Sequence, residues 1–267
     1  MKHLPKKREA VVEGQKLTYT MVGQGAPAIV LLNGAGGPLE GWYRLYPEIE
    51  KLGTVVAYDR PGVGGSPRPL EPQTGHTVVR TLWNLLRELG VKPPYVLVGH
   101  SFGGLHANLF ARLYPNDVAG VVFLEAAAPD DIGMMKTHQS TAQRIVNGML
   151  NLFSRPDPND EVSNEQQTVT QLNAAAAFPN VPLCVISGGK TPPGWMSSPQ
   201  ALQLRAQHQD ALARLSPRGH QIIASGSGHF PQMTEPGVVI QAIENVVKAA
   251  RAESQSPSHQ RTPASIG

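Results

Sequence analysis

The sequence predicts an α/β protein built on a mostly parallel, twisted sheet with helices on both faces. Two observations carry this prediction. Short, continuously apolar runs recur along the chain, and segments with apolar residues at helical spacing lie between them. Strands with no polar face are typical of parallel sheets that are covered on both sides. The length of 267 residues suits one large α/β domain.

The elements follow in order from these patterns. Alternating apolar and polar residues over 10–14 and 16–21 predict an antiparallel hairpin. The strands expected after it share continuous apolar character and cover 28–32, 54–58, 95–98, 118–124, 182–187 and 221–224. The helices expected between them share apolar residues at helical spacing and cover 77–89, 102–113, 201–215 and 237–250. Residues 10–128 and 181–251 are therefore interpreted as the core.

The alternation of strands and helices stops over residues 129–180. This segment has weak helical periodicity and no expected strand, so it is interpreted as a small helical cap inserted into the core. Residues 1–9 form a basic N-terminal tail. Residues 252–267 are rich in Ser, Gln, Pro and Thr and are expected to be disordered.

Composition and charge exclude several partners. The formal charge is +3, and much of the excess comes from the basic tail. No part of the body carries a basic stripe with aromatic residues, so nucleic acid is not an expected partner. The N-terminus lacks an apolar signal region, and no apolar run approaches the roughly 18 residues of a membrane span, so the protein is expected to be cytoplasmic without a membrane partner. The single cysteine, Cys184, lies in an apolar run and is interpreted as a buried hydrophobic residue.

The most informative motif is residues 99–103, which read Gly-His-Ser-Phe-Gly and join the expected strand 95–98 to the expected helix 102–113. A serine on a sharp turn from strand to helix is exposed at the carboxyl edge of the sheet, where ligands of parallel sheets bind. Glycines beside it allow the strand and the helix to pack closely. Ser101 is therefore the candidate nucleophile. The alternative is a glycine-rich turn with an incidental serine.

A serine nucleophile needs a base, and His229 is the candidate. It follows the expected strand 221–224 and lies between glycine and the last helix, at the same edge as Ser101. The other histidines occupy less suitable places. His3 and His259 lie in the tails, and His76, His138 and His208 lie in polar segments that are expected to be solvated. His106 lies in the helix after Ser101, His100 lies beneath the turn, and His220 lies at the opposite end of the last strand.

A tetrahedral intermediate also needs two hydrogen-bond donors for its oxyanion. One would be the backbone N–H of Phe102, and the other would come from residues 33–38, which read Asn-Gly-Ala-Gly-Gly-Pro and follow the expected strand 28–32. A dinucleotide-binding turn is rejected for this loop, because Gly34 and Gly36 lack a third glycine at the required spacing.

Four segments together resemble the α/β-hydrolase superfamily: residues 33–34, the run Asp-Arg-Pro-Gly-Val-Gly-Gly-Ser at 59–66, residues 99–104, and Gly-Ser-Gly-His at 226–229. The resemblance covers about residues 10–250. It implies the α/β-hydrolase fold, a triad of serine, histidine and an acid, and an oxyanion hole formed by the N–H groups of Ala35 and Phe102. It also implies no cofactor. No metal site is expected. Asn33 departs from the family, which commonly has histidine there.

The acid is missing from its commonest place in this superfamily, the loop after the expected strand 182–187. No Asp or Glu occurs between Gln166 and Gln209. Glu125 ends the preceding strand and is the candidate acid, as in certain haloalkane dehalogenases, which look similar in taking their acid from this strand. Asp130 and Asp131 remain alternatives, and Glu125 could instead be a salt-bridged scaffold residue.

Serine at position 101 argues against the dehalogenase and epoxide hydrolase branches, whose nucleophile is a carboxylate. The expected function is a serine esterase, a carboxylesterase that cleaves small or medium esters through an acyl-enzyme. Its expected partner is a small-molecule ester, and the cap methionines Met134, Met135 and Met149 would select the acyl or alcohol group.

Other functions use the same parts. A lactonase, amidase, carbon–carbon bond hydrolase or cofactor-free perhydrolase would need no different residues. A second class is a small-molecule receptor or signalling protein of the same fold with slow hydrolysis. The sequence leaves these alternatives and the oligomeric state open.

Overall fold

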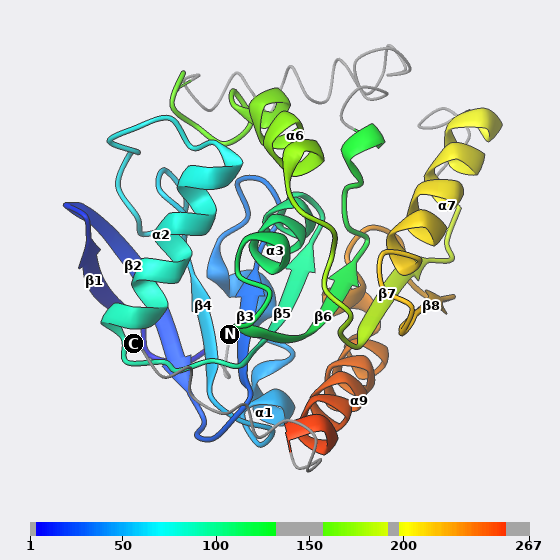
Figure 1. Ribbon diagram of the computed structural model, residues 1–267, viewed down its shortest axis with the longest axis horizontal. Helices are drawn as coiled ribbons and strands as arrows, with labels where there is room; N and C mark the ends of the chain where they lie inside the picture. The colour runs from blue at the N-terminus through cyan, green and yellow to red at the C-terminus, as the bar shows by residue number, and fades with distance from the viewer. Residues whose placement is uncertain (1–3, 132–156, 192–197, 255–267) are drawn as a thin grey trace, which may run out of the picture.

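The computed structural model describes residues 4–131, 157–191 and 198–254. Within these ranges the strands form one eight-stranded sheet in the order β1-β2-β4-β3-β5-β6-β7-β8 (Figure 1). The strands are β1 (Arg8–Val12), β2 (Gln15–Val22), β3 (Ala28–Leu32), β4 (Val55–Tyr58), β5 (Tyr95–His100), β6 (Val118–Leu124), β7 (Leu183–Gly188) and β8 (Gly219–Ala224). The first hairpin is antiparallel and β2 pairs antiparallel with β4, while β4, β3 and β5 to β8 run parallel. The prediction of a mostly parallel α/β sheet is confirmed.

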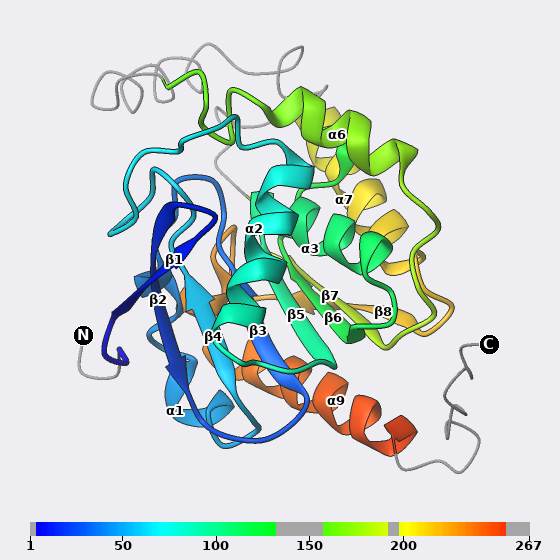
Figure 2. The same ribbon diagram turned by 60° about the vertical axis from the view of Figure 1, so that its left-hand side comes forward.

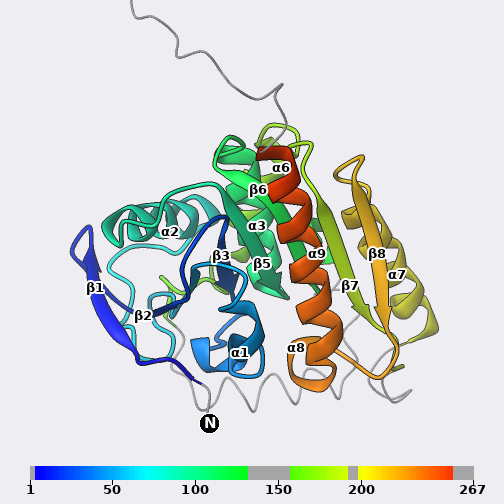
Figure 3. The ribbon, with the colours of Figure 1, turned by 90° about the horizontal axis from the view of Figure 1, so that it is seen from below.

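Helices cover both faces of the sheet. They are η1 (Leu39–Trp42), α1 (Tyr46–Ile49), α2 (Gly75–Glu88), α3 (Phe102–Leu113), α6 (Glu165–Ala174), α7 (Pro199–Ala213), α8 (Pro231–Thr234) and α9 (Pro236–Ser254). Figure 2 shows α2, α3 and α7 on one face and α1 and α9 on the other. Figure 3, from below, shows α9 lying along the sheet with α1 and α8 beside it.

The central strands explain why the sequence lacks a polar face there. All five residues of β3 are buried. Val30 and Leu32 belong to the core cluster beneath α2 and α3, whereas Ile29 and Leu31 belong to the cluster beneath α9. Because successive strand side chains point to opposite faces, a strand between two helical layers must be apolar at every position.

Element ends differ from the sequence expectation where caps or pairing extend them. The helix α2 begins two residues earlier than expected, because the Thr74 hydroxyl caps it by accepting a 3.3 Å hydrogen bond from the N–H of Thr77. Ser198 caps α7 in the same way. The strand β1 includes Arg8 of the basic tail, because Arg8 pairs with Tyr19 of β2.

The described part of the 129–180 segment packs against the first turn of α2. The N–H of His76 donates to the side chain of Gln171 at 2.8 Å, and the N–H of Gln73 donates to the carbonyl of Asn159 at 2.9 Å. The helix α6 buries Thr168, Val169 and Leu172, and Figures 1 and 2 show it above α2 and α3. The methionines of this segment, Met134, Met135 and Met149, lie outside the described residues.

In the described ranges, no helix is both long enough and apolar enough to cross a membrane.

Candidate active site

Ser101 lies at a sharp turn between β5 and α3, at the carboxyl ends of the parallel strands. Its backbone φ is 50° and its ψ is −121°, a conformation that costs a residue with a side chain about 1–3 kcal/mol. The main chain is held from both sides: the Ser101 N–H donates to the carbonyl of Leu124, and the Ser101 carbonyl accepts from the N–H of Ala127, both at 3.0 Å. The end of β6 therefore stabilises the strained turn.

Glycines surround Ser101 because backbones approach too closely there for a side chain. A Cβ on Gly103 would lie 2.2 Å from the carbonyl oxygen of Leu32, at the end of β3. One on Gly99 would lie 2.8 Å from the carbonyl oxygen of Gly103, and one on Gly104 would lie 2.4 Å from the side chain of Ala126. The prediction that these glycines permit close packing of strand and helix is confirmed.

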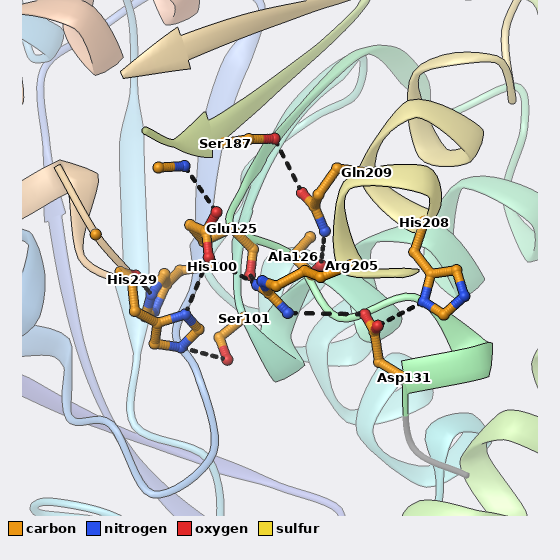
Figure 4. A network of polar contacts seen from close by, with 12 residues as sticks. His100, Ser101, Glu125, Ala126, Asp131, Ser187, Arg205, His208, Gln209 and His229 are labelled. Carbon is orange, nitrogen blue, oxygen red and sulfur yellow. Dashed lines mark hydrogen bonds and ion pairs between the residues drawn. The ribbon is translucent and has the colours of Figure 1, made fainter. Parts of the chain in front are cut away.

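His229 lies in the loop between β8 and α8, beside Ser101 (Figure 4). Its Nε2 atom is 3.0 Å from the Oγ atom of Ser101. His100 supports this loop from beneath, because its Nε2–H donates to the carbonyl of His229 at 2.8 Å. Burial, together with the neighbouring His229 ring, lowers the pKa of His100 to about 4. His100 is therefore a neutral support at neutral pH.

Glu125 directly follows β6 and faces the other nitrogen of the His229 ring. Its Oε2 atom is 3.4 Å from Nδ1 of His229, and its Oε1 atom accepts a 2.7 Å hydrogen bond from the N–H of Gly188. Like Ser101, Glu125 has a positive φ, 46°. Burial alone would raise its pKa, but the contacts with His229, Arg205 and Gly188 outweigh burial and lower the pKa of Glu125 to about 2. Glu125 is thus a carboxylate at neutral pH.

Arg205, on α7, shares this carboxylate, and no sequence pattern pointed to it. Its Nη2 atom donates to Oε2 of Glu125 at 2.7 Å and to the Glu125 carbonyl at 3.2 Å (Figure 4). Charge-assisted hydrogen bonds are usually about 2.7–2.9 Å long. The longer contact between Glu125 and His229 fits an oxygen that already accepts a short bond from arginine.

The alternative acids lie elsewhere. Asp130 is exposed, and Asp131 is buried with Oδ1 at 2.6 Å from Nδ1 of His208 and Oδ2 accepting from the N–H of Ala128 at 2.7 Å. Among the described carboxylates, Glu125 is the one within hydrogen-bond distance of His229. The expectation that His208 is solvated is wrong, because its side chain is 14% exposed and paired with Asp131.

Residues 33–37, here called the oxyanion loop, pack against Ser101. A Cβ on Gly34 would lie 3.2 Å from Cβ of Ser101. Asn33 is buried, and its Nδ2 donates to the carbonyl of Pro38 at 2.7 Å, which closes the loop. No described residue accepts a hydrogen bond from the N–H of Ala35. The N–H of Phe102 opens α3, where helical N–H groups have no partner within the helix.

An ion pair that the sequence did not reveal lies beneath this loop. Arg60 follows β4, and Glu161 precedes α6; their side chains are 2% and 7% exposed. The guanidinium also donates to the carbonyls of Asn33, at 2.8 Å, and Gly34, at 2.7 Å. Arg60 belongs to the 59–66 motif, but its partner lies 101 residues further along the chain. No local pattern could have identified Glu161.

The remaining candidate residues have structural explanations. Cys184 is buried in β7, and burial raises the pKa of its thiol to about 12. Asp59 accepts hydrogen bonds from the N–H groups of Leu39 and Gly65 at 2.7 and 2.9 Å, so it holds two loops together. In the part of the chain that the structure describes, no group of three or more His, Cys, Asp or Glu side chains could hold a metal ion.

Comparisons with known proteins agree with this architecture. A family model for the alpha/beta hydrolase fold matches residues 27–201. The uncharacterized protein YqjL of Bacillus subtilis is 28% identical over 245 residues, which cover 89% of this chain and 90% of YqjL. Polyneuridine aldehyde esterase of Rauvolfia serpentina is 35% identical over 91 residues, which cover 33% of this chain and 34% of that protein.

Among solved structures, a thermophilic esterase from Thermogutta terrifontis is similar with a TM-score of 0.62 at 20% identity, over 92% of this chain and 99% of that chain. At this identity the likeness concerns the fold. The family model, by contrast, covers most of the sheet together with the turn that carries Ser101. This chain belongs to the alpha/beta hydrolase family.

Proposed function

We propose that this protein is a serine hydrolase that cleaves small or medium carboxylic esters through an acyl-enzyme intermediate. The observation that carries the proposal is the chain of contacts from Oγ of Ser101 through the His229 ring to the Glu125 carboxylate. It lies at the carboxyl ends of the strands, where ligands of such sheets bind. The similarity to polyneuridine aldehyde esterase supports the same class of substrate.

In the first half of the proposed reaction, Oγ of Ser101 attacks the ester carbonyl carbon while Nε2 of His229 takes its proton. The Glu125 carboxylate holds the ring through Nδ1–H and stabilises the imidazolium. The N–H groups of Ala35 and Phe102 donate to the oxyanion. The intermediate then collapses, the bond to the alcohol oxygen breaks, and His229 gives its proton to the departing alcohol.

In the second half, water attacks the acyl group on Ser101. His229 takes a proton from this water. The tetrahedral intermediate then collapses, the bond to Oγ of Ser101 breaks, and His229 gives the proton to Oγ, which releases the carboxylic acid and free Ser101. Phe230 lies next to His229, with ring centroids 5.1 Å apart, and its side chain is 52% exposed. We assign it as apolar surface for the hydrocarbon part of the ester. The proposed catalytic residues are Ser101, His229 and Glu125, and no cofactor is required.

The test combines turnover with active-site labelling. Wild-type protein should hydrolyse p-nitrophenyl acetate and butyrate with many turnovers and should take up one organophosphonate group, on Ser101, as read by mass spectrometry of peptides. Ser101→Ala should lower kcat by about 10⁴-fold or more and abolish labelling. Ser225→Ala, at an exposed serine in the His229 loop, is the matched control and should behave as wild type.

Two outcomes would contradict the proposal. Labelling or ester hydrolysis that persists in Ser101→Ala would remove Ser101 from the reaction. A wild type that releases product only once per molecule would instead favour a receptor with slow hydrolysis. Parallel assays with an aryl amide and a lactone measure which acyl compound gives the highest kcat/KM.

A further inference from the structure

The peptide bond between Gly34 and Ala35 has its carbonyl on one side and the proposed oxyanion donor on the other. This bond is trans, because the cis peptides of the described residues are both X-Pro bonds elsewhere. In a planar trans peptide the C=O and the N–H point in opposite directions. Whatever fixes the Gly34 carbonyl therefore also fixes the direction of the Ala35 N–H.

Arg60 fixes that carbonyl. Its Nη2 atom donates to the Gly34 carbonyl at 2.7 Å, and its Nη1 atom donates to the Asn33 carbonyl at 2.8 Å. The rigid guanidinium thus holds two successive carbonyls of the oxyanion loop. A cationic donor on the Gly34 carbonyl also polarises the peptide, which strengthens the opposite N–H as a hydrogen-bond donor.

Glu161 completes the arrangement on the other side of Ala35. Its Oε1 atom accepts from the N–H of Gly36 at 3.1 Å and from Nη2 of Arg60 at 2.8 Å, and its Oε2 atom accepts from Nε of Arg60. The backbone on both sides of Ala35 is therefore bound to one pair of side chains. These side chains come from separate parts of the chain, the loop after β4 and the segment before α6.

The burial of this pair argues for a specific role. Among the ion pairs of the described residues, the pair of Arg60 and Glu161 is the one in which both side chains are less than a tenth exposed. Buried ion pairs are weak contributors to stability, and apolar side chains of similar volume often replace them without loss. This pair is costly to bury, and its remaining hydrogen bonds all go to one short loop. Its role is therefore best explained as fixing the geometry of that loop.

We propose that Arg60 and Glu161 are positioning residues that aim the Ala35 N–H at the oxyanion and thereby set the rate of acyl transfer. This inference rests on the proposed serine hydrolase function. It also gives the segment before α6 a part in the reaction, because Glu161 lies there. Neither residue needs to touch the substrate.

The experiment compares Glu161→Gln, Arg60→Lys and the apolar double variant Arg60→Met with Glu161→Leu. The concentration of active sites is measured as the total amount of phosphonate bound when labelling is complete. The kcat of each variant is then expressed per active, folded molecule. Two ligands separate transition-state binding from ground-state binding. The Ser101 oxygen adds to the carbonyl carbon of an aryl trifluoromethyl ketone, and the resulting adduct carries an oxyanion. The matching secondary alcohol has no carbonyl group and cannot form this adduct.

The expected result is a fall in kcat of about 10- to 100-fold with KM changed by less than about threefold. Affinity for the trifluoromethyl ketone should fall in parallel with kcat/KM, and affinity for the alcohol should stay the same. The matched controls are Arg80→Lys and Glu13→Gln, which change an ion pair whose side chains are 45% and 50% exposed. They should leave all four quantities unchanged.

The possible failures are distinguishable. A wild type that neither hydrolyses esters nor labels at Ser101 would contradict the proposed function and this inference with it. If the wild type is active, and both Glu161→Gln and the double variant have the same kcat and the same ketone affinity as the wild type, only this inference is overturned. A failure of all three variants to fold would also overturn it, because the pair would then be structural. If only Arg60→Lys fails to fold, the other two variants decide.

Discussion

Arg205 is ion-paired with Glu125 through the same carboxylate oxygen that faces the His229 ring. The distances from this oxygen are 2.7 Å to Nη2 of Arg205 and 3.4 Å to Nδ1 of His229 (Figure 4). The two nitrogens are therefore at most about 6 Å apart. The guanidinium both competes for the oxygen and repels a positive charge on the ring. In the proposed reaction, the imidazolium is therefore less stabilised than it would be by a carboxylate without arginine.

This arrangement predicts an altered pH dependence in Arg205→Met. Arg205 is one of the groups that lower the pKa of Glu125, so its removal raises that pKa and the carboxylate is protonated at a higher pH. The loss of kcat/KM at acidic pH should therefore begin at a higher pH than in the wild type. The measurement is the pH profile of p-nitrophenyl acetate hydrolysis from pH 4 to 9. Arg214→Met, at an exposed arginine just after α7, is the control. An unchanged profile in Arg205→Met would show that Arg205 has no influence on Glu125.

Substitution of the candidate acid gives a second prediction. Glu125→Gln removes the charge that would stabilise the imidazolium and should lower kcat by roughly 10²- to 10⁴-fold while the protein stays folded. Asp130→Asn, at an exposed position, should keep full activity. Asp131→Asn should lose less than Glu125→Gln, because Asp131 bonds to His208 rather than to His229. Near wild-type kcat in Glu125→Gln with a large loss in Asp131→Asn would reverse the assignment.

A third prediction concerns His106, which lies on α3 and is fully buried. Neither ring nitrogen has a partner among the described residues. Burial, and then the charge of Arg60, lowers the pKa of His106 to about 3. An unfolded histidine has a pKa of about 6.5. Below that pH the unfolded chain binds a proton that the folded protein does not, so stability is lost as the pH falls.

His106→Leu should therefore flatten the decline of unfolding free energy with pH. Relative to pH 7, the wild type should lose roughly 2 kcal/mol more than the variant at pH 5. Urea unfolding at pH 7, 6 and 5 measures this difference. His106→Met fills a similar volume and should give the same flattening. Equal slopes for the wild type and both variants would contradict the assigned cause.

The sequence predicted the fold well because both of its signals are local. Continuous apolar runs marked the strands, including β3 and β6 with their observed bounds, since burial on both faces leaves no polar positions. The glycines around Ser101 were also readable, because close backbone contact excludes every other residue. These constraints act within a few residues of the motif that shows them.

The supporting residues of the site were not predictable in the same way. Arg205 reaches Glu125 across 80 residues of sequence, and Glu161 reaches Arg60 across 101. A charged side chain on a helix or in a loop has no periodicity that identifies its partner, so either residue could have been solvated. His208 was expected to be solvated for this reason, yet it pairs with the buried Asp131. Only the folded arrangement brings these charges together.

A last prediction tests the packing that holds the oxyanion loop against Ser101. In Gly103→Ala the new Cβ would lie 2.2 Å from the carbonyl oxygen of Leu32 and 2.4 Å from that of Asn33. Backbone must move to relieve these contacts, which should lower the free energy of unfolding by about 2–4 kcal/mol. Because the moving backbone is the start of the oxyanion loop, kcat should fall as well.

The matched control for this prediction is Gly237→Ala, near the start of α9. A Cβ there meets no atom within 4 Å, and the backbone φ lies outside the positive range. Alanine has a higher helix propensity than glycine by about 1 kcal/mol in a helix interior, so this variant should be as stable as wild type or more stable. Chemical unfolding and ester turnover of both variants provide the comparison. Equal stability of Gly103→Ala and Gly237→Ala would mean that the turn can open without cost, and the close approach of α3 to β3 would then not hold the oxyanion loop.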